Sequence, residues 1–178
     1  PGETPATLTY GMFAAHSDAL AAGLARAGIR RGDRVALLLP QSFETAIAHA
    51  AIYKLGAIAV PLALLFGAEA LEYRLFTSGA AAVITNDTGL SKIARIRDRL
   101  PALRLSVCVD GASGDTQDFH RIIAENAGPF EAAATGPDDP AMMIFTSGTT
   151  GPPKGALHGH RVLLGHLPGV QFHHEFLP

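Results

Sequence analysis

Continuous apolar runs alternate along this chain with longer segments whose apolar residues recur every three or four positions. The runs VALLLP, AIAVPL and AAVITN contain few polar residues, which is typical of strands buried on both faces. The expected strands are 35–40, 57–62, 81–86, 103–110 and 141–145. The expected helices are 10–27, 42–55, 68–78, 92–100 and 118–126. This order predicts an α/β fold with a mostly parallel sheet and helices on both of its faces.

The segment 146–155, TSGTTGPPKG, follows the last expected strand and concentrates small polar residues. Glycines without Cβ atoms let backbone N–H groups converge on an anion, hydroxyls add donors, and a lysine adds a positive charge. The pattern predicts a polyphosphate-binding loop rather than a flexible surface loop, because two prolines and an ordered spacing restrict it. The candidate binding residues are Thr146, Ser147, Gly148, Thr149, Thr150, Gly151 and Lys154.

The spacing of this segment excludes two commoner phosphate loops. A Walker loop requires Gly-Lys followed by Ser or Thr, whereas Lys154 follows Pro153 and precedes Gly155. A dinucleotide-binding fingerprint requires G-x-G-x-x-G, and no G-x-G occurs in the chain. In open α/β sheets, ligands bind beyond the carboxyl ends of the strands. The segment follows such an end, so the fold and the loop chemistry indicate the same site.

TSGTTGPPKG resembles the signature loop of the adenylate-forming superfamily, which includes acyl-CoA synthetases, aryl-CoA ligases, luciferases and the adenylation domains of peptide synthetases. Two further stretches, 8–42 and 54–86, also resemble acyl-CoA synthetases, and the string ALEYRL is closest to the acetyl- and medium-chain members. Met12 stands where many members carry a Glu that could complete a capping box with Thr9. This departure is expected to reduce helix stability slightly without affecting function.

The resemblance implies a ligase that works in two steps. A carboxylate attacks the α-phosphate of Mg-ATP to give an acyl adenylate and pyrophosphate, and the thiol of CoA then displaces AMP. The candidate loop residues would wrap the β- and γ-phosphates, and Lys154 would be the catalytic cation that offsets charge on the departing pyrophosphate. The implied cofactors are ATP and Mg2+, with coenzyme A as co-substrate and a small-molecule carboxylate as the other partner.

Members of this superfamily are much longer, and their later motifs for magnesium, for the ribose and for a carboxy-terminal lysine do not occur in these 178 residues. We therefore expect 1–178 to be a single α/β subdomain, the amino-terminal fragment of a longer AMP-binding domain, without activity of its own. Two alternatives remain open. One is a phosphate- or nucleotide-binding module without catalysis, and the other is an interaction subdomain without ligand affinity.

The composition narrows the classes of function. A net charge of −2 with scattered arginines argues against binding to nucleic acid or an anionic membrane surface. The longest apolar run, around AIAVPLALLFGA, is too short to span a bilayer and contains Pro61. Cys108, the single cysteine, is expected to be a core thiol in a reducing, cytoplasmic setting, and no signal-peptide pattern opens the chain. Buried-type strands without full cover predict that the fragment self-associates.

Histidines gather near the end of the sequence. They are His158, His160, His166, His173 and His174. Their spacing matches no familiar zinc site, so no metal-binding residues are predicted. His160 and Arg161 are expected to open the helix that follows the phosphate loop. The acidic pair Asp138 and Asp139 precedes Pro140 and is expected to be a solvated turn rather than a pair of catalytic carboxylates.

Overall fold

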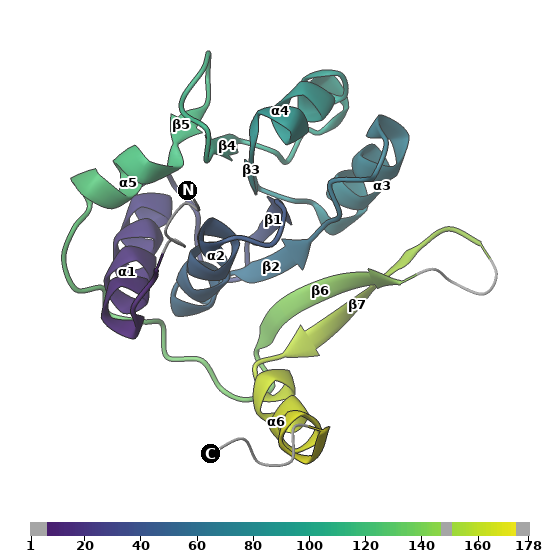
Figure 1. Ribbon diagram of the computed structural model, residues 1–178. Coiled ribbons are helices and arrows are strands. Elements are labelled where there is room, and N and C mark those ends of the chain that lie inside the picture. Colours follow the sequence, from purple (N-terminus) through teal and green to yellow (C-terminus); the bar gives the residue numbers. More distant parts are fainter. Residues whose placement is uncertain (1–6, 147–150, 174–178) are drawn as a thin grey trace, which may run out of the picture.

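Within residues 7–146 and 151–173, which the computed structural model describes, seven strands form one sheet and helices cover both of its faces (Figure 1). The strand order is β5-β4-β3-β1-β2-β6-β7, and neighbouring strands are parallel except for β6 and β7. The strands are β1 Arg34–Leu38, β2 Ile58–Pro61, β3 Ala82–Thr85, β4 Leu105–Cys108, β5 Gln117–Asp118, β6 Pro140–Thr146 and β7 Lys154–Gly159. The helices are α1 Tyr10–Arg26, α2 Phe43–Lys54, α3 Ala68–Ser78, α4 Asp87–Ala94, η1 Arg97–Arg99 (a 3-10 turn), α5 Phe119–Glu125 and α6 Arg161–His173.

Two apolar clusters hold the layers together, one on each face of the sheet. On one face, α1, α2 and α5 pack against alternate strand residues such as Val35 and Leu37. On the other face, α3 and α4 pack against the intervening strand residues, such as Ala36 and Leu38 of β1. The central strands are therefore buried on both sides, as their continuous apolar runs predict. The α/β fold with helices on both faces is confirmed.

One expected helix, 92–100, is wrong. Helix α4 begins earlier, at Asp87, because the side chain of Asn86 accepts a hydrogen bond from the N–H of Gly89 at 3.0 Å and caps the helix. The helix ends at Ala94, and the short turn η1 replaces its expected second half. Among the described residues, no helix combines the length and the apolar character that crossing a membrane requires.

Helix α1 begins where the sequence predicts, because Thr9 Oγ1 accepts a hydrogen bond from the N–H of Met12 at 3.2 Å. Two strands are additions to the prediction. Strand β5 is two residues long and extends the sheet beside β4, and β7 turns back along β6 as its antiparallel partner. Strand β6 therefore ends in a hairpin rather than leading directly into a helix.

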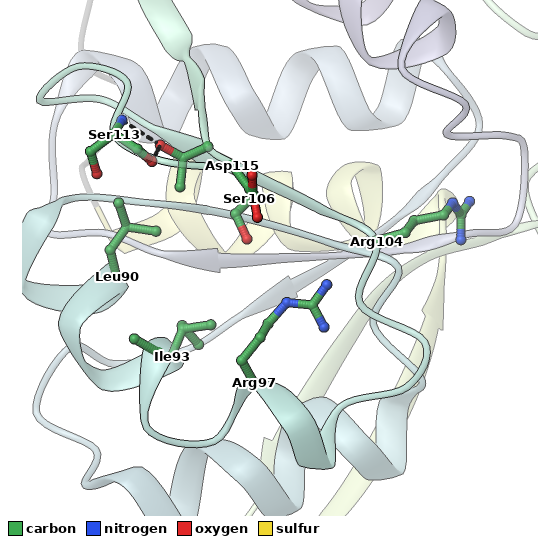
Figure 2. A pocket seen from close by; sticks show the side chains of 9 residues that line it. Leu90, Ile93, Arg97, Arg104, Ser106, Ser113 and Asp115 are labelled. Atoms are coloured by element: carbon green, nitrogen blue, oxygen red, sulfur yellow. Dashed lines mark hydrogen bonds between the residues drawn. The ribbon is translucent and has the colours of Figure 1, made fainter.

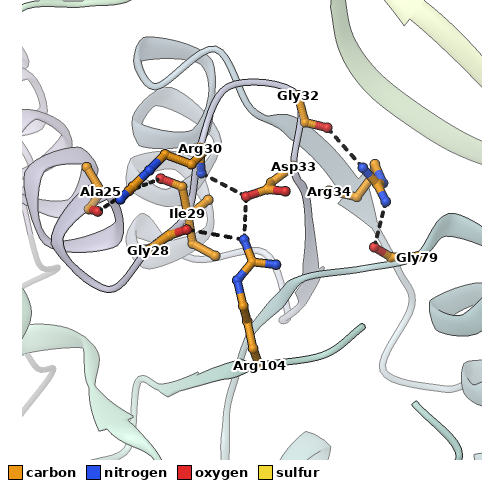
Figure 3. A network of polar contacts seen from close by, with 9 residues as sticks. All are labelled: Ala25, Gly28, Ile29, Arg30, Gly32, Asp33, Arg34, Gly79 and Arg104. Atoms are coloured by element: carbon orange, nitrogen blue, oxygen red, sulfur yellow. Dashed lines mark hydrogen bonds and ion pairs between the residues drawn. The ribbon is translucent and has the colours of Figure 1, made fainter. Parts of the chain in front are cut away.

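An arginine network closes the edge of the sheet at which the parallel strands begin (Figure 3). Arg34, the first residue of β1, donates from Nε to the carbonyl of Ser78 at 2.7 Å and from Nη2 to the carbonyl of Gly79 at 2.9 Å. Asp33 accepts a hydrogen bond from Nη2 of Arg104, the residue before β4. These bonds occupy carbonyls at the end of α3 and tie the starts of β1 and β4 together.

Candidate phosphate-binding site

The predicted phosphate loop joins two antiparallel strands at the outer end of a hairpin (Figure 1). In the register of this hairpin, Thr146 lies opposite Lys154, so two candidate residues close the loop. The loop expected over 146–155 therefore ends at Pro153. Lys154 and Gly155 are strand residues because they pair with the last residues of β6. The hairpin thus fixes the backbone of the predicted catalytic lysine.

Thr146 and Lys154 share one face of the hairpin. Directly opposite residues in an antiparallel pair have Cβ atoms about 4.5–5.5 Å apart on the same face. The hydroxyl and the ammonium group can therefore act on one anion at the base of the loop. Both residues are exposed, and within the described part of the chain the Lys154 ammonium forms no ion pair. Its charge is available to a ligand.

The described residues include only part of the candidate set. Gly151 has a φ of +95°, in the left-handed region that favours glycine, and it lies in a bend just before the two prolines. Thr146 and Lys154 stand at the two ends of the loop. Ser147, Gly148, Thr149 and Thr150 lie outside the described residues. The contacts of all seven candidates with phosphate stay a prediction.

The hairpin emerges at the edge of the sheet where the parallel strands end. Strand β6 runs parallel to β2 and pairs with it at Ala59 and Met142. The loop after β6 therefore lies at the same edge as the ends of β1, β2 and β3. Ligands of open α/β sheets gather at this edge. The geometry agrees with the position that the strand order predicts for the site.

A polar cluster lies beneath the hairpin, between β6 and α2. The hydroxyl of Tyr53 is 3.0 Å from Nδ1 of His49 and donates to Sδ of Met142 at 3.7 Å. The ring of His160 meets Tyr53 edge to face, and its buried Nε2 has no hydrogen-bond partner among the described residues. Burial lowers the pKa of His49 and raises the pKa of Tyr53, so both side chains are neutral at pH 7.

Two of the histidines flagged in the sequence lie in this part of the structure. His158 is a residue of β7, and His160 directly precedes α6, which begins at Arg161. The helix therefore begins where the sequence predicts, but β7 separates it from the loop. His173 is the last described residue of α6, and His174 lies outside the described residues.

A group of possible metal ligands lies at the ends of β3 and β4. Asp87, Cys108 and Asp110 bring their ligand atoms within 4.8 Å of one another. The thiol of Cys108 donates to Oδ1 of Asp87 at 3.5 Å, and Oδ2 of Asp110 accepts the N–H of Asp87 at 2.9 Å. Burial, the largest cause, raises the pKa of the Cys108 thiol, and the side chain is fully buried. A protonated, buried thiol fits the predicted core cysteine rather than a nucleophile.

The acidic pair before β6 forms ion pairs with arginines. Asp139 pairs with Arg31 at 2.8 Å and also accepts the N–H of Gly136 at 2.7 Å. Asp138 pairs with Arg161 at 2.5 Å. These ion pairs link the connection before β6 to the turn that precedes β1 and to the first residue of α6. The two carboxylates are thus engaged in holding the turn.

A cavity of about 320 Å³ opens between α4 and β4, on the part of the sheet remote from the hairpin (Figure 2). Leu90 and Ile93 of α4 form its apolar side, while Arg97, Ser106 and Asp115 add polar groups. Strands β3, β1 and β2 separate β4 from β6 in the sheet. None of the described candidate residues lines this cavity, which is therefore distinct from the predicted phosphate site.

Comparison with known sequences identifies one family over nearly the whole chain. The family described as AMP-binding enzyme matches residues 3–176. The acyl-coenzyme A synthetase ACSM1 of Homo sapiens, a mitochondrial protein, is 32% identical over 138 residues, which cover 77% of this chain and 24% of that protein. The long-chain-fatty-acid–CoA ligase FadD13 of Mycobacterium tuberculosis is 33% identical over 157 residues, which cover 88% of this chain and 30% of the ligase.

Solved structures give the same result. The anthranilate CoA ligase AuaEII, solved in complex with anthranoyl-AMP, superposes with a TM-score of 0.86 and 32% sequence identity. The match covers 92% of this chain and 32% of that ligase. The chain thus spans about a quarter to a third of the length of these relatives.

Proposed function

The chain belongs to the AMP-binding enzyme family, and from this premise we propose that it forms the amino-terminal part of an ATP-dependent acid–thiol ligase. In this proposal residues 1–178 are one α/β subdomain of a longer AMP-binding domain. The observation that carries the proposal is the hairpin: it holds an exposed Lys154 opposite Thr146, at the base of a loop of glycines and hydroxyl residues. A single buried thiol, Cys108, fits a reducing, cytoplasmic setting.

In the first step, a carboxylate oxygen attacks the α-phosphorus of ATP, and the bond from that phosphorus to the bridging oxygen of pyrophosphate breaks. Negative charge then builds on the departing β- and γ-phosphates. The loop N–H groups, the hydroxyls from Thr146 to Thr150 and the Lys154 ammonium would offset this charge. In the second step, the sulfur of CoA attacks the acyl carbon and AMP leaves, while the thiol proton is released.

The residues present fit a polyphosphate better than a metal ion. Residues 146–157 contain three hydroxyl-bearing threonines, one serine and a lysine, but no Asp or Glu. Mg2+ prefers carboxylate and phosphate oxygens as ligands, so the phosphates of ATP and residues beyond this hairpin would hold it. In this proposal ATP and CoA are substrates, and the role of this chain is to bind and orient the phosphates.

Relatives of nearly equal identity are named for different acids. The solved relative is an anthranilate ligase, and the mycobacterial relative is a long-chain-fatty-acid ligase. We therefore infer that this part of the chain carries the activation chemistry that such ligases share. The choice of acid belongs to residues that follow it in the full-length enzyme.

The test is exchange of pyrophosphate into ATP by the full-length protein, with a panel of short, medium and long fatty acids and aromatic acids. The proposal predicts exchange that depends on at least one acid, and none by residues 1–178 alone. Acid-dependent exchange by the 178-residue chain would show that the remaining parts are dispensable. ATP binding without exchange for any acid would instead favour a nucleotide-binding module.

We also propose that residues 1–178 self-associate when separated from the rest of the enzyme. Leu157 of β7 and Leu164 and Leu167 of α6 are each at least half exposed. Exposed apolar groups on neighbouring elements tend to find partners. Light scattering at increasing concentration would show growing mass, and a constant monomer mass would contradict the proposal.

A further inference from the structure

Two adjacent residues of α3 contact the hairpin on either side of the phosphate loop, at Pro153 and at Phe145. We propose that Tyr73 and Arg74 are positioning residues that hold Lys154 and Thr146 in the arrangement needed for the reaction. The inference rests on the proposed ligase function. Each residue acts through the backbone or side chain next to a candidate phosphate ligand, rather than on the phosphate itself.

Tyr73 fixes the strand that descends from the loop. Its hydroxyl donates a hydrogen bond to the carbonyl oxygen of Pro153 at 3.0 Å. Pro153 directly precedes Lys154, and neither Pro152 nor Pro153 has an N–H group with which to bond β6. The hydroxyl of Tyr73 therefore anchors the chain at the point where the hairpin lacks backbone donors of its own.

Arg74 fixes the strand that rises to the loop. The carbon at the centre of its guanidinium group lies 4.1 Å from the ring centroid of Phe66 and 5.9 Å from that of Phe145. Nη1 donates to the carbonyl of Ala70 at 2.8 Å, which holds the side chain against its own helix. Phe145 directly precedes Thr146, so the stacking of cation and ring fixes β6 one residue before the loop.

These contacts matter because the hairpin extends past its neighbour in the sheet. Strand β2 pairs with β6 at Ala59 and Met142 and ends at Pro61. In this parallel register, Phe145 and Thr146 run beyond the last residue of β2. Figure 1 shows the hairpin projecting away from the helical body. The outer part of the hairpin therefore lies past the end of β2, whereas its inner part pairs with β2. Helix α3 supplies contacts to this outer part.

Helix α3 is itself firmly held. Leu71 is fully buried and Leu75 is 2% exposed, so the helix is anchored on the sheet. Lys92 of α4 donates to the carbonyls of Leu64 and Phe66, which fixes the loop that carries the ring beneath Arg74. A catalytic group displaced by about 1 Å can cost a large factor in rate. A rigid support for both strands would therefore maintain the position of the lysine.

The first experiment compares two tyrosines that each lose only a hydroxyl in the full-length ligase. Tyr73→Phe removes the bond to Pro153, whereas the control Tyr53→Phe removes a hydroxyl that contacts β6 at Met142. We expect Tyr73→Phe to lower kcat about three- to tenfold, as for one hydrogen bond, and to change the KM for ATP less than about twofold. Tyr53→Phe should leave kcat within about twofold. Equal kcat values for Tyr73→Phe and the unsubstituted enzyme would overturn the proposal.

The second experiment does not depend on ligase activity. Hydrogen exchange should rise selectively at amides 154–157 in Tyr73→Phe, but not in Tyr53→Phe. Arg74→Lys keeps the charge but loses the planar group, so exchange should rise at amides 141–146. Unchanged exchange, or a general rise shared with the control, would overturn the proposal. If the unsubstituted protein exchanges no pyrophosphate with any acid, the proposed function fails, and the hydrogen-exchange pattern still decides whether α3 holds the hairpin.

Discussion

The arginines at one edge of the sheet and Lys154 at the other edge are used in opposite ways. At the edge where the strands begin, Arg34 and Arg104 donate to backbone carbonyls, and Arg104 also pairs with Asp33 (Figure 3). At the edge where the strands end, Lys154 is exposed and its ammonium has no ion-pair partner in the described part of the chain. The two arginines are engaged by the fold, whereas the Lys154 ammonium remains available to a ligand.

The direction of the helices explains this difference. Helices α1 and α3 end at the edge where the strands begin, so their last carbonyls accumulate there. These carbonyls carry partial negative charge and lack partners within the helix. Arginines satisfy them, as Arg34 does for Ser78 and Gly79. At the opposite edge, Lys92 is bound to the carbonyls of Leu64 and Phe66, but Lys154 at the base of the loop is exposed and can meet an anion.

The largest expected effect concerns Lys154, at the edge where the strands end. For the ligase activity proposed above, Lys154→Ala in the full-length protein should lower kcat by about ten- to a hundredfold, or roughly 1–3 kcal/mol, if the ammonium acts mainly on the transition state. The KM for ATP should rise less than kcat falls. Because the side chain is exposed, the free energy of unfolding should change by less than about 0.5 kcal/mol. Steady-state kinetics and denaturant titration measure the two quantities.

Two further variants complete this test. Lys154→Arg should recover part of the lost rate, because a planar fork keeps the charge but not the compact shape of an ammonium group. Arg95→Ala removes a charge from an exposed position between α4 and η1 and should leave kcat within about twofold. If Lys154→Ala and Arg95→Ala have equally small effects, Lys154 is a solvated surface cation.

The next largest effect concerns Arg34, at the edge where the parallel strands begin. Arg34→Ala should lower the free energy of unfolding by about 2 kcal/mol, because the carbonyls of Ser78, Gly79 and Gly32 lose a charged donor. For a chain of this size, that corresponds to a fall of about 4–8 °C in the melting temperature. At temperatures where the variant remains folded, kcat should be unchanged. A loss of kcat without a loss of stability would show that the two edges are not independent.

Much of the fold could be predicted because it depends on local patterns. Continuous apolar runs identify β1, β2 and β3, and the caps at Thr9 and Ser42 mark helix starts within a residue of the prediction. The start of α4 could also have been found, because Asn86 followed by Asp87 is a typical helix start. By contrast, β7 has the sequence KGALHG, with two glycines and little alternation. It is a strand because β6 lies beside it, which local preference does not reveal.

The candidate site also has features that local sequence predicts and features that depend on tertiary packing. The concentration of glycines and hydroxyls predicts a phosphate loop, and the position of this loop after β6 follows from the strand order. The hairpin that places Lys154 opposite Thr146 depends on pairing between β6 and β7. The contact between Tyr73 and Pro153 joins residues 80 positions apart. Contacts of this kind follow from tertiary packing, so composition and spacing do not predict them.

A smaller effect concerns the glycine that ends α3. Gly79 has a φ of +61°, and a Cβ there would lie 2.7 Å from Nη2 of Arg34. Gly79→Ala should therefore cost about 1 kcal/mol for the left-handed backbone, with a further loss from displacing the arginine. Gly28→Ala is the matched control, because Gly28 has a φ of +93° and open space around the added atom. Equal losses in the two variants would show that Arg34 adjusts without cost.

The smallest expected effect concerns His49, which is half-buried and lies 3.0 Å from the hydroxyl of Tyr53. Burial lowers the pKa of His49 in the folded protein below its ordinary value near 6.5, so the unfolded chain binds the proton more readily. The free energy of unfolding should therefore fall as the pH drops below about 6.5 and stop falling below the lowered folded pKa. His49→Gln should reduce this pH dependence, whereas His120→Gln, at an exposed position, should retain it. Denaturant midpoints at pH 7.5 and 5.5 measure how much the free energy of unfolding changes with pH in each variant. An equal change in the two variants would mean that His49 does not contribute to the pH dependence, and that other groups are responsible.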